Sequence, residues 1–200
     1  MKFILIFLVY SLSASAGLIP QSFSARYENS WQSAIGGTKK QEGTLDYKYP
    51  SNVRLDVKSE PKTTLVTNKN TTWYYQPAFN PKEESQVSIQ KSSSHPVIKF
   101  LDSMKDGLEN SKFFTSKITG NDMTLTFNEA GKKEFSFQEV ILHANKAFKD
   151  ITLKDIDSIE MKDANGKLQK LRFLELKEGV SFPASHFVFE IPPKTKQIKN

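Results

Sequence analysis

The chain has 200 residues, contains no cysteine and carries a formal net charge of +6 at pH 7. This length suits one domain with a hydrophobic core, and the lack of cysteine excludes disulfide bonds and thiol catalysis. The basic excess is spread along the chain and coincides with no nucleic-acid-binding motif, so we expect no nucleic-acid partner.

The N-terminus has the features of a secretory signal peptide. An apolar run over residues 3–10 follows a basic residue, and Ala14 and Ala16 form an A-x-A cleavage motif. The run is shorter than the ~20 residues of a membrane-spanning helix. We therefore expect cleavage after Ala16, which removes residues 1–16 and leaves one exported domain over residues 17–200. An exported chain without cysteine fits a bacterial envelope.

Most of the remaining chain alternates apolar and polar residues with a period of two, which predicts β-strands with one buried face. Phe23 and Tyr27 share a face in the first such segment. Tyr47, Tyr49 and Leu55 share a face in the next. Because that second segment contains a proline near its middle, it forms either one bent strand or two strands.

Residues 71–77 read TTWYYQP and place three aromatic residues side by side. Successive side chains of a strand point to opposite faces, so Trp73 and Tyr75 must lie on one face and Tyr74 on the other. We expect Trp73 and Tyr75 on the concave, apolar face of the sheet and Tyr74 on its outer surface.

One segment follows a helical period. Val97, Leu101, Met104 and Leu108 are spaced by four, three and four residues, which places them in one apolar stripe, and Pro96 suits the first turn. We expect a helix over residues 96–110.

The C-terminal half returns to the strand pattern. Phe127 ends one alternating run, and Phe187 and Phe189 belong to another. Residues 139–149 are ambiguous, and we favour a helix there over a bent strand. Polar or glycine-containing stretches predict hairpin connections, namely residues 67–70, 129–133 and 163–167, with a longer glycine-rich loop over residues 33–43.

These elements predict a mainly β fold. An antiparallel sheet with one apolar face must cover that face, either with a second sheet or by curling on itself. Because the chain supplies little helix, we expect one strongly curved antiparallel sheet that forms a half-open β-barrel, with the helix over residues 96–110 as a short lid.

Residues with catalytic or metal-binding potential are sparse. His95, His143 and His186 have no ligand spacing, and the chain lacks the common hydrolase, metalloprotease and phosphate-loop motifs. We therefore expect no catalytic residue, no metal and no cofactor, and we predict that the protein is not an enzyme.

The abundant aromatic residues indicate a different function. A curled sheet closed by an amphipathic helix can enclose an apolar cavity that suits an acyl chain. The residues that we expect to line this cavity and its lid are Phe23, Tyr27, Tyr47, Tyr49, Leu55, Trp73, Tyr75, Leu101, Met104, Leu108, Phe127, Phe187 and Phe189.

The order of three short motifs resembles that of the periplasmic outer-membrane lipoprotein carrier protein (LolA) family. The family pattern runs G-x-L-x-x-(K/R)-x-P, then W-x-Y-x-P, then F-x-F-x-x-P-x-G. The matching residues are Gly43, Leu45, Lys48 and Pro50, then Trp73, Tyr75 and Pro77, then Phe187, Phe189 and Pro192. Residues 112–180 match only in character.

The resemblance implies a soluble, monomeric periplasmic carrier with a half-open barrel and a helical lid. Such a carrier binds the acyl chains of lipoproteins released by an inner-membrane ABC transporter and delivers them to an outer-membrane acceptor lipoprotein. The acceptor shares the fold but has a lipid-modified cysteine, which this chain lacks. The alternative is a periplasmic carrier of free lipid or glycolipid on the same scaffold.

The sequence departs from the family pattern at three places. Tyr49 stands where the family usually has an arginine that holds the lid shut. Only residues 17–21 precede the first strand, where the family has a helix that forms part of the lid. Thr195 replaces the usual glycine. These departures indicate a divergent carrier with a more open cavity, or a paralogue for another lipid.

Overall fold

The computed structural model describes residues 17–33, 35–80, 82–91, 96–108, 111–148 and 150–199, and for Val97 and Asp106 only the backbone. The predicted signal peptide and His95 lie outside the described residues. The elements in chain order are β1 (Ser22–Gln32), β2 (Thr38–Lys48), β3 (Asn52–Val57), β4 (Thr63–Thr67), β5 (Thr71–Gln76), β6 (Ser85–Lys91), α1 (Pro96–Ser103), the 3₁₀ helix η2 (Met104–Asp106), β7 (Phe114–Thr119), β8 (Asp122–Phe127), α2 (Glu129–Phe135), β9 (Phe137–Ala144), the 3₁₀ helix η3 (Leu153–Asp155), β10 (Ile156–Asp163), β11 (Leu168–Glu178), the 3₁₀ helix η4 (Ala184–Phe187) and β12 (Thr195–Lys199).

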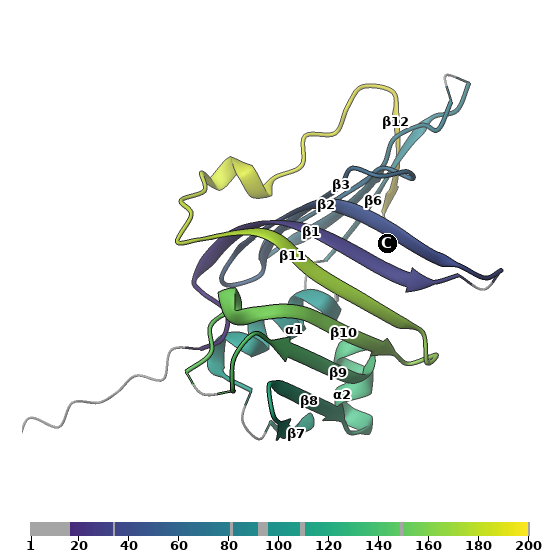
Figure 1. Ribbon diagram of the computed structural model, residues 1–200. Helices are drawn as coiled ribbons and strands as arrows, with labels where there is room; N and C mark the ends of the chain where they lie inside the picture. The colour runs from purple at the N-terminus through teal and green to yellow at the C-terminus, as the bar shows by residue number, and fades with distance from the viewer. Residues whose placement is uncertain are drawn as a thin grey trace, which may run out of the picture.

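Within the described residues, twelve strands form one sheet in the order β12-β6-β5-β4-β3-β2-β1-β11-β10-β9-β8-β7. Neighbouring strands are antiparallel except for β12, which runs parallel to β6 at one edge. The sheet curves strongly, so that β7–β10 turn beneath β1 and β11, with α1 and α2 on the concave side (Figure 1). The predicted mainly β, half-open barrel with a short helical lid is confirmed.

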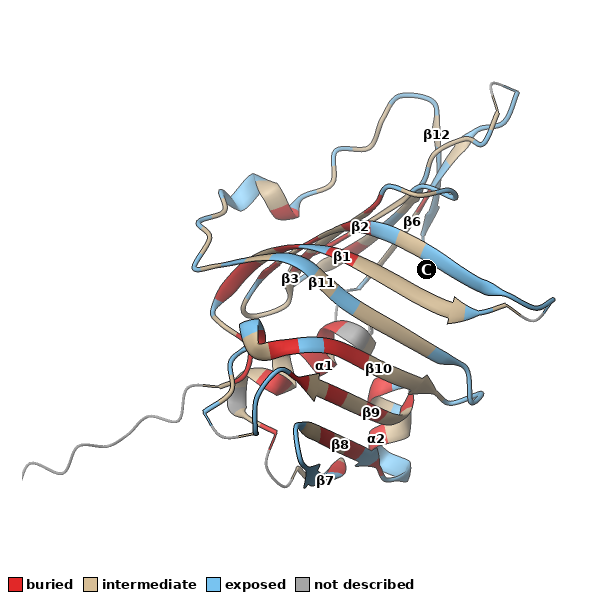
Figure 2. Ribbon diagram, in the orientation of Figure 1, coloured by how far each residue is buried: buried red, intermediate tan, exposed pale blue. Residues whose placement is uncertain are grey.

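The hydrophobic core lies between the concave face and the helices. Buried residues gather on β8–β10, on α1 and on the inner part of β1 (Figure 2). Phe100 of α1 packs edge-on against three rings, those of Phe127, Phe135 and Phe137, with centroid distances of 5.5–5.9 Å. Edge-to-face aromatic pairs of this kind add stability beyond their buried area. The lid helix is therefore anchored in an aromatic cluster.

The lid helix is shorter than the sequence predicts. Instead of a helix over residues 96–110, α1 ends at Ser103 and tightens into η2. Gly107 follows with a φ of 103°, a positive value that glycine adopts readily, and the helix ends there. Leu101, Met104 and Leu108 are nevertheless all buried, as the apolar stripe predicts.

Two predictions in the middle of the chain were wrong. The described residues of the segment 139–149, which are 139–148, do not form a helix, because Val140, Leu142 and Ala144 are buried on one face of strand β9, which pairs with both β8 and β10. Residues 129–133 are not a hairpin turn but part of α2. The Asn128 side chain caps that helix by accepting a hydrogen bond from the Gly131 N–H at 3.0 Å.

The prediction of a strand through Phe187 and Phe189 was also wrong. Residues 184–187 form η4, and the chain then runs irregularly to β12. Pro183, Pro192 and Pro193 flank this stretch, and proline cannot donate to a strand ladder. The C-terminal segment, residues 180–194, instead crosses the convex face of the sheet (Figure 1).

The turns at residues 67–70 and 163–167 are confirmed as hairpins that join β4 to β5 and β10 to β11. Of the two alternatives for the proline-containing segment, the structure has two strands, β2 and β3, joined at residues 49–51. The loop predicted over residues 33–43 is shorter, because β2 already begins at Thr38.

Candidate functional site

A cavity of about 380 Å³ lies between the concave face and the lid helix. Its walls come from β1–β5, from β9–β11, and from α1, η2 and η3, with Ile19 ahead of β1, and they are mostly aliphatic and aromatic. The volume falls in the range of ~300–1,000 Å³ that is usual for small-molecule sites.

The two ends of the cavity differ. Ile19, Met104 and Leu153 close the inner end, and each is 1% exposed. The other end is lined by half-buried polar residues, including Asn29, Gln41, Asp163 and Gln169. Because neighbouring strands are antiparallel, the turns that join β1 to β2 and β10 to β11 lie together at this polar end. The cavity therefore opens at the end of the sheet where these turns lie.

The structure brings some of the predicted site residues to the cavity. Tyr27, Leu55, Leu101 and Met104 line it. Phe23, Tyr47, Leu108 and Phe127 do not line it but are buried in the surrounding core. Tyr49 is half-buried and packs against that core.

Strand β5 has the opposite orientation to the predicted one. Side chains alternate as expected, but Tyr74 lines the cavity while Trp73 and Tyr75 lie on the convex face. The register explains this placement, since Tyr74 lies opposite Leu65, which lines the cavity, and Trp73 lies opposite Val66. The predicted face of Trp73 and Tyr75 was therefore wrong.

The C-terminal segment covers the convex face that Trp73 and Tyr75 share. The ring of Phe189 packs on Tyr75 with a centroid distance of 5.1 Å, and Phe187 is buried. Asn68 donates to the Phe187 carbonyl at 3.1 Å. Phe187 and Phe189 therefore belong to a second apolar layer outside the sheet, and their predicted place in the cavity was wrong too.

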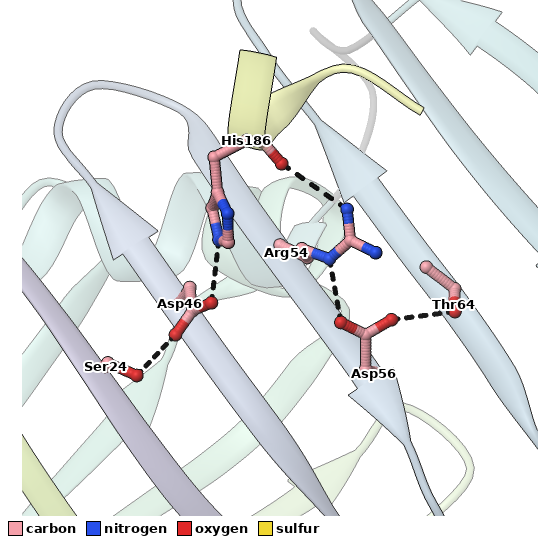
Figure 3. A network of polar contacts seen from close by, with 6 residues as sticks. All are labelled: Ser24, Asp46, Arg54, Asp56, Thr64 and His186. Atoms are coloured by element: carbon pink, nitrogen blue, oxygen red, sulfur yellow. Dashed lines mark hydrogen bonds and ion pairs between the residues drawn. The ribbon is translucent and has the colours of Figure 1, made fainter. Parts of the chain in front are cut away.

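Polar contacts fix this segment to the sheet (Figure 3). His186 Nε2 lies 2.7 Å from Asp46 Oδ2, and Ser24 Oγ donates to the other Asp46 oxygen at 2.5 Å. Arg54 reaches the His186 carbonyl at 3.5 Å and pairs with Asp56 at 2.8 Å. The histidine thus serves as an attachment point for the C-terminal segment on the outer face.

The lid helix is tied to the β2–β3 turn by a carboxylate. Asp102 of α1 accepts hydrogen bonds from Tyr47 Oη at 2.8 Å, from Ser51 N at 3.2 Å and from Ser51 Oγ at 2.7 Å. The donors flank Tyr49, the position where the sequence departs from the family arginine. Sequence reasoning missed Asp102, because one aspartate beside an apolar stripe looks like an ordinary solvated residue.

The buried phenol of Tyr27 is the titratable group in the cavity wall whose pKa is shifted. Burial raises the pKa of Tyr27 to about 12, and the charge of Asp56 adds to this effect. Tyr27 is therefore neutral throughout the physiological pH range. Among the described residues, no group of His, Asp and Glu side chains is arranged to hold a metal ion. No described helix has the length and hydropathy that a membrane crossing requires.

Comparison with known families decides the relationship. Residues 20–190 match the family model of the outer membrane lipoprotein carrier protein LolA. The chain belongs to the LolA family. A sequence search of curated proteins finds no match.

Comparison with solved structures finds proteins similar to this chain. An uncharacterized conserved protein from Thermus thermophilus is 11% identical, with 90% of this chain and 91% of that chain covered and a TM-score of 0.52. A LolA superfamily protein from Nitrosomonas europaea is 13% identical, with 88% and 94% covered and a TM-score of 0.49.

One expected departure from the LolA pattern concerns the N-terminal part of the lid. Residues 17–21 contain no helix, yet Leu18 and Ile19 are buried, and Ile19 lines the inner end of the cavity. A short non-helical segment with bends at Leu18 and Ile19 therefore fills part of the space between the sheet and η2.

Proposed function

We propose that the protein is a periplasmic carrier that binds the acyl chains of lipoproteins in the cavity and moves them from the inner to the outer membrane. The observation that carries this proposal is an apolar cavity that is closed at its inner end and lies under a helical lid. Burial of each CH₂ group contributes ~0.8 kcal/mol, so a long chain can offset the cost of association.

The chemistry of the wall supports a carrier rather than an enzyme. Its titratable residues, among those described, are Tyr27, Tyr74 and Asp163. Asp163 accepts backbone hydrogen bonds from Asn165 and Lys167 of its own turn, at 2.8 and 2.9 Å. No nucleophile stands beside a base in this set, so we propose that the protein makes and breaks no bond.

The remaining parts of the proposal rest on the sequence of the N-terminus and on what the family resemblance implies. Residues 1–16 act as a cleaved signal peptide, and residues 17–200 act as one monomeric periplasmic domain. The proposed partners are an inner-membrane lipoprotein-releasing ABC transporter and, where one is present, an outer-membrane acceptor lipoprotein.

Release of a lipoprotein from inner-membrane vesicles tests the proposal. The purified protein should release an acylated lipoprotein into a soluble complex. Leu171→Glu, which places a charge in the cavity wall, should abolish release. Leu174→Glu on the same strand is the matched control, because Leu174 is 39% exposed and does not line the cavity.

The outcomes separate the two carriers that the scaffold suits. Release that survives in Leu171→Glu contradicts a role for this cavity. Co-purified phospholipid or glycolipid in native mass spectrometry, without any release of lipoprotein, favours the carrier of free lipid instead.

A further inference from the structure

The open end of the cavity carries a cluster of carboxamide side chains. Asn29, Gln41 and Gln169, here called the amide cluster, come from the neighbouring strands β1, β2 and β11 and all line the cavity. Asn29 lies directly opposite Gln41, and Gln169 lies opposite Trp31, one diagonal step from Asn29. Further inside, the same strands contribute Tyr27, Leu45 and Leu171 to the wall. The wall therefore changes from apolar to amide at its mouth.

The amide cluster is not satisfied by the fold alone. Asn29 Nδ2 donates to Gln169 Oε1 at 3.3 Å. Asn29 Oδ1 is shielded from solvent and has no hydrogen-bond partner among the residues that the structure describes. A shielded oxygen without a donor destabilises the empty protein, and a ligand that supplies the donor recovers this loss.

The free groups define the chemistry of that ligand. Asn29 Oδ1 needs a hydrogen-bond donor. The contact between the two side chains uses Oε1 of Gln169 as the acceptor, so Nε2 of Gln169 can donate a hydrogen bond to a ligand. Rotating both carboxamides by 180° exchanges the roles but still presents one donor and one acceptor. A secondary amide offers both an N–H and a C=O, whereas an ester offers acceptors alone.

We propose that the amide cluster recognises the secondary amide of an amide-linked acyl chain at the head of the cargo. This inference rests on the proposed function. It adds that the mouth of the cavity selects amide-linked acyl chains over lipids that contain only ester bonds. The apolar wall provides most of the affinity, and the side chains of Asn29 and Gln169 provide the specificity for the linkage.

A pair of probes that differ in one linkage tests the inference. One is a tripalmitoylated cysteinyl peptide, and the other is its analogue with an ester in place of the N-terminal amide. Affinities come from displacement of a fluorescent fatty acid from the purified full-length protein. The wild type should bind the amide probe about tenfold more tightly, since the ester leaves Asn29 Oδ1 without a donor.

Asn29→Leu should remove this preference and retain binding of the ester probe. Gln32→Leu is the matched control, because Gln32 is an exposed amide at the end of the same strand and does not line the cavity. Circular dichroism confirms that both variants fold.

Each other outcome contradicts one of the two proposals. Equal affinity of the wild type for the two probes, or an equal loss for both in Asn29→Leu, overturns the amide selection and leaves the carrier intact. If neither probe displaces the fatty acid from the wild type, the carrier function itself fails, and the selection fails with it.

Discussion

Asp102 is the residue whose contacts best explain how the lid stays closed. It is half-buried and joins α1 to Tyr47 of β2 and to Ser51 of the β2–β3 turn. Hydrogen bonds to a charged group contribute ~1.5–3 kcal/mol, so Asp102→Ala should lower the free energy of unfolding by about that amount. The same variant should release bound fatty acid faster, because the lid opens more often.

Urea unfolding and stopped-flow release measure both effects. Lys99→Ala on the same helix is the control, because the Lys99–Glu134 ion pair is partly exposed and contributes at most ~1 kcal/mol. Equal stability and equal release rates in the two variants would show that Asp102 does not hold the lid.

Tyr27 makes the free energy of unfolding depend on pH in the alkaline range. Its pKa rises from about 10 to about 12 on folding, so the unfolded chain loses this proton first. The stability that the neutral phenol provides is complete below pH ~10 and is lost between pH ~10 and ~12, with a total on the order of 3 kcal/mol. Tyr27→Phe should therefore lose less stability than the wild type when urea unfolding is compared at pH 9 and 11.5.

Among the elements of the fold, the C-terminal segment should contribute to the stability of the protein but not to its affinity for fatty acid. Phe187 is buried on the convex face, on the other side of the sheet from the cavity. Phe187→Ala should lower the free energy of unfolding by ~3–5 kcal/mol, as is usual for a buried phenylalanine. Fatty-acid affinity, measured where the variant is still folded, should not change. A parallel loss of affinity would show that the outer layer and the cavity are coupled.

The elements also show what the sequence could predict. Alternation correctly separated Tyr74 from Trp73 and Tyr75, and the apolar stripe correctly placed Leu101 and Met104 in the lid. Alternation cannot say which face is concave when both faces are covered. Here the C-terminal segment covers the convex face, and that contact spans more than a hundred residues of sequence.

Other failures have local physical causes. Strand β9 was mistaken for a helix because apolar residues over 139–149 fit both periods, and only pairing with two neighbouring strands decides between them. The amide cluster could not be predicted from the sequence for a related reason. Its members are far apart in sequence and become neighbours only through the register of β1 with β2 and β11.

At the scale of the whole molecule, cargo should stabilise the fold, because the cavity is assembled from both halves of the curved sheet and from the lid. The unfolded chain has no such site, so a ligand at 100 times its Kd adds about 2.7 kcal/mol to the free energy of unfolding. For a chain of this size, that corresponds to a rise in Tm of roughly 5–10 °C.

Thermal unfolding with and without the tripalmitoylated peptide measures this rise. Leu174→Glu should retain it. Leu171→Glu should lose it, since a charge in the wall opposes entry of an acyl chain. A rise that persists in Leu171→Glu would place the acyl chain elsewhere on the protein, because stabilisation of the native state requires binding to a site that unfolding destroys. The cavity is the cargo site only if a charge in its wall also removes the stabilisation by cargo.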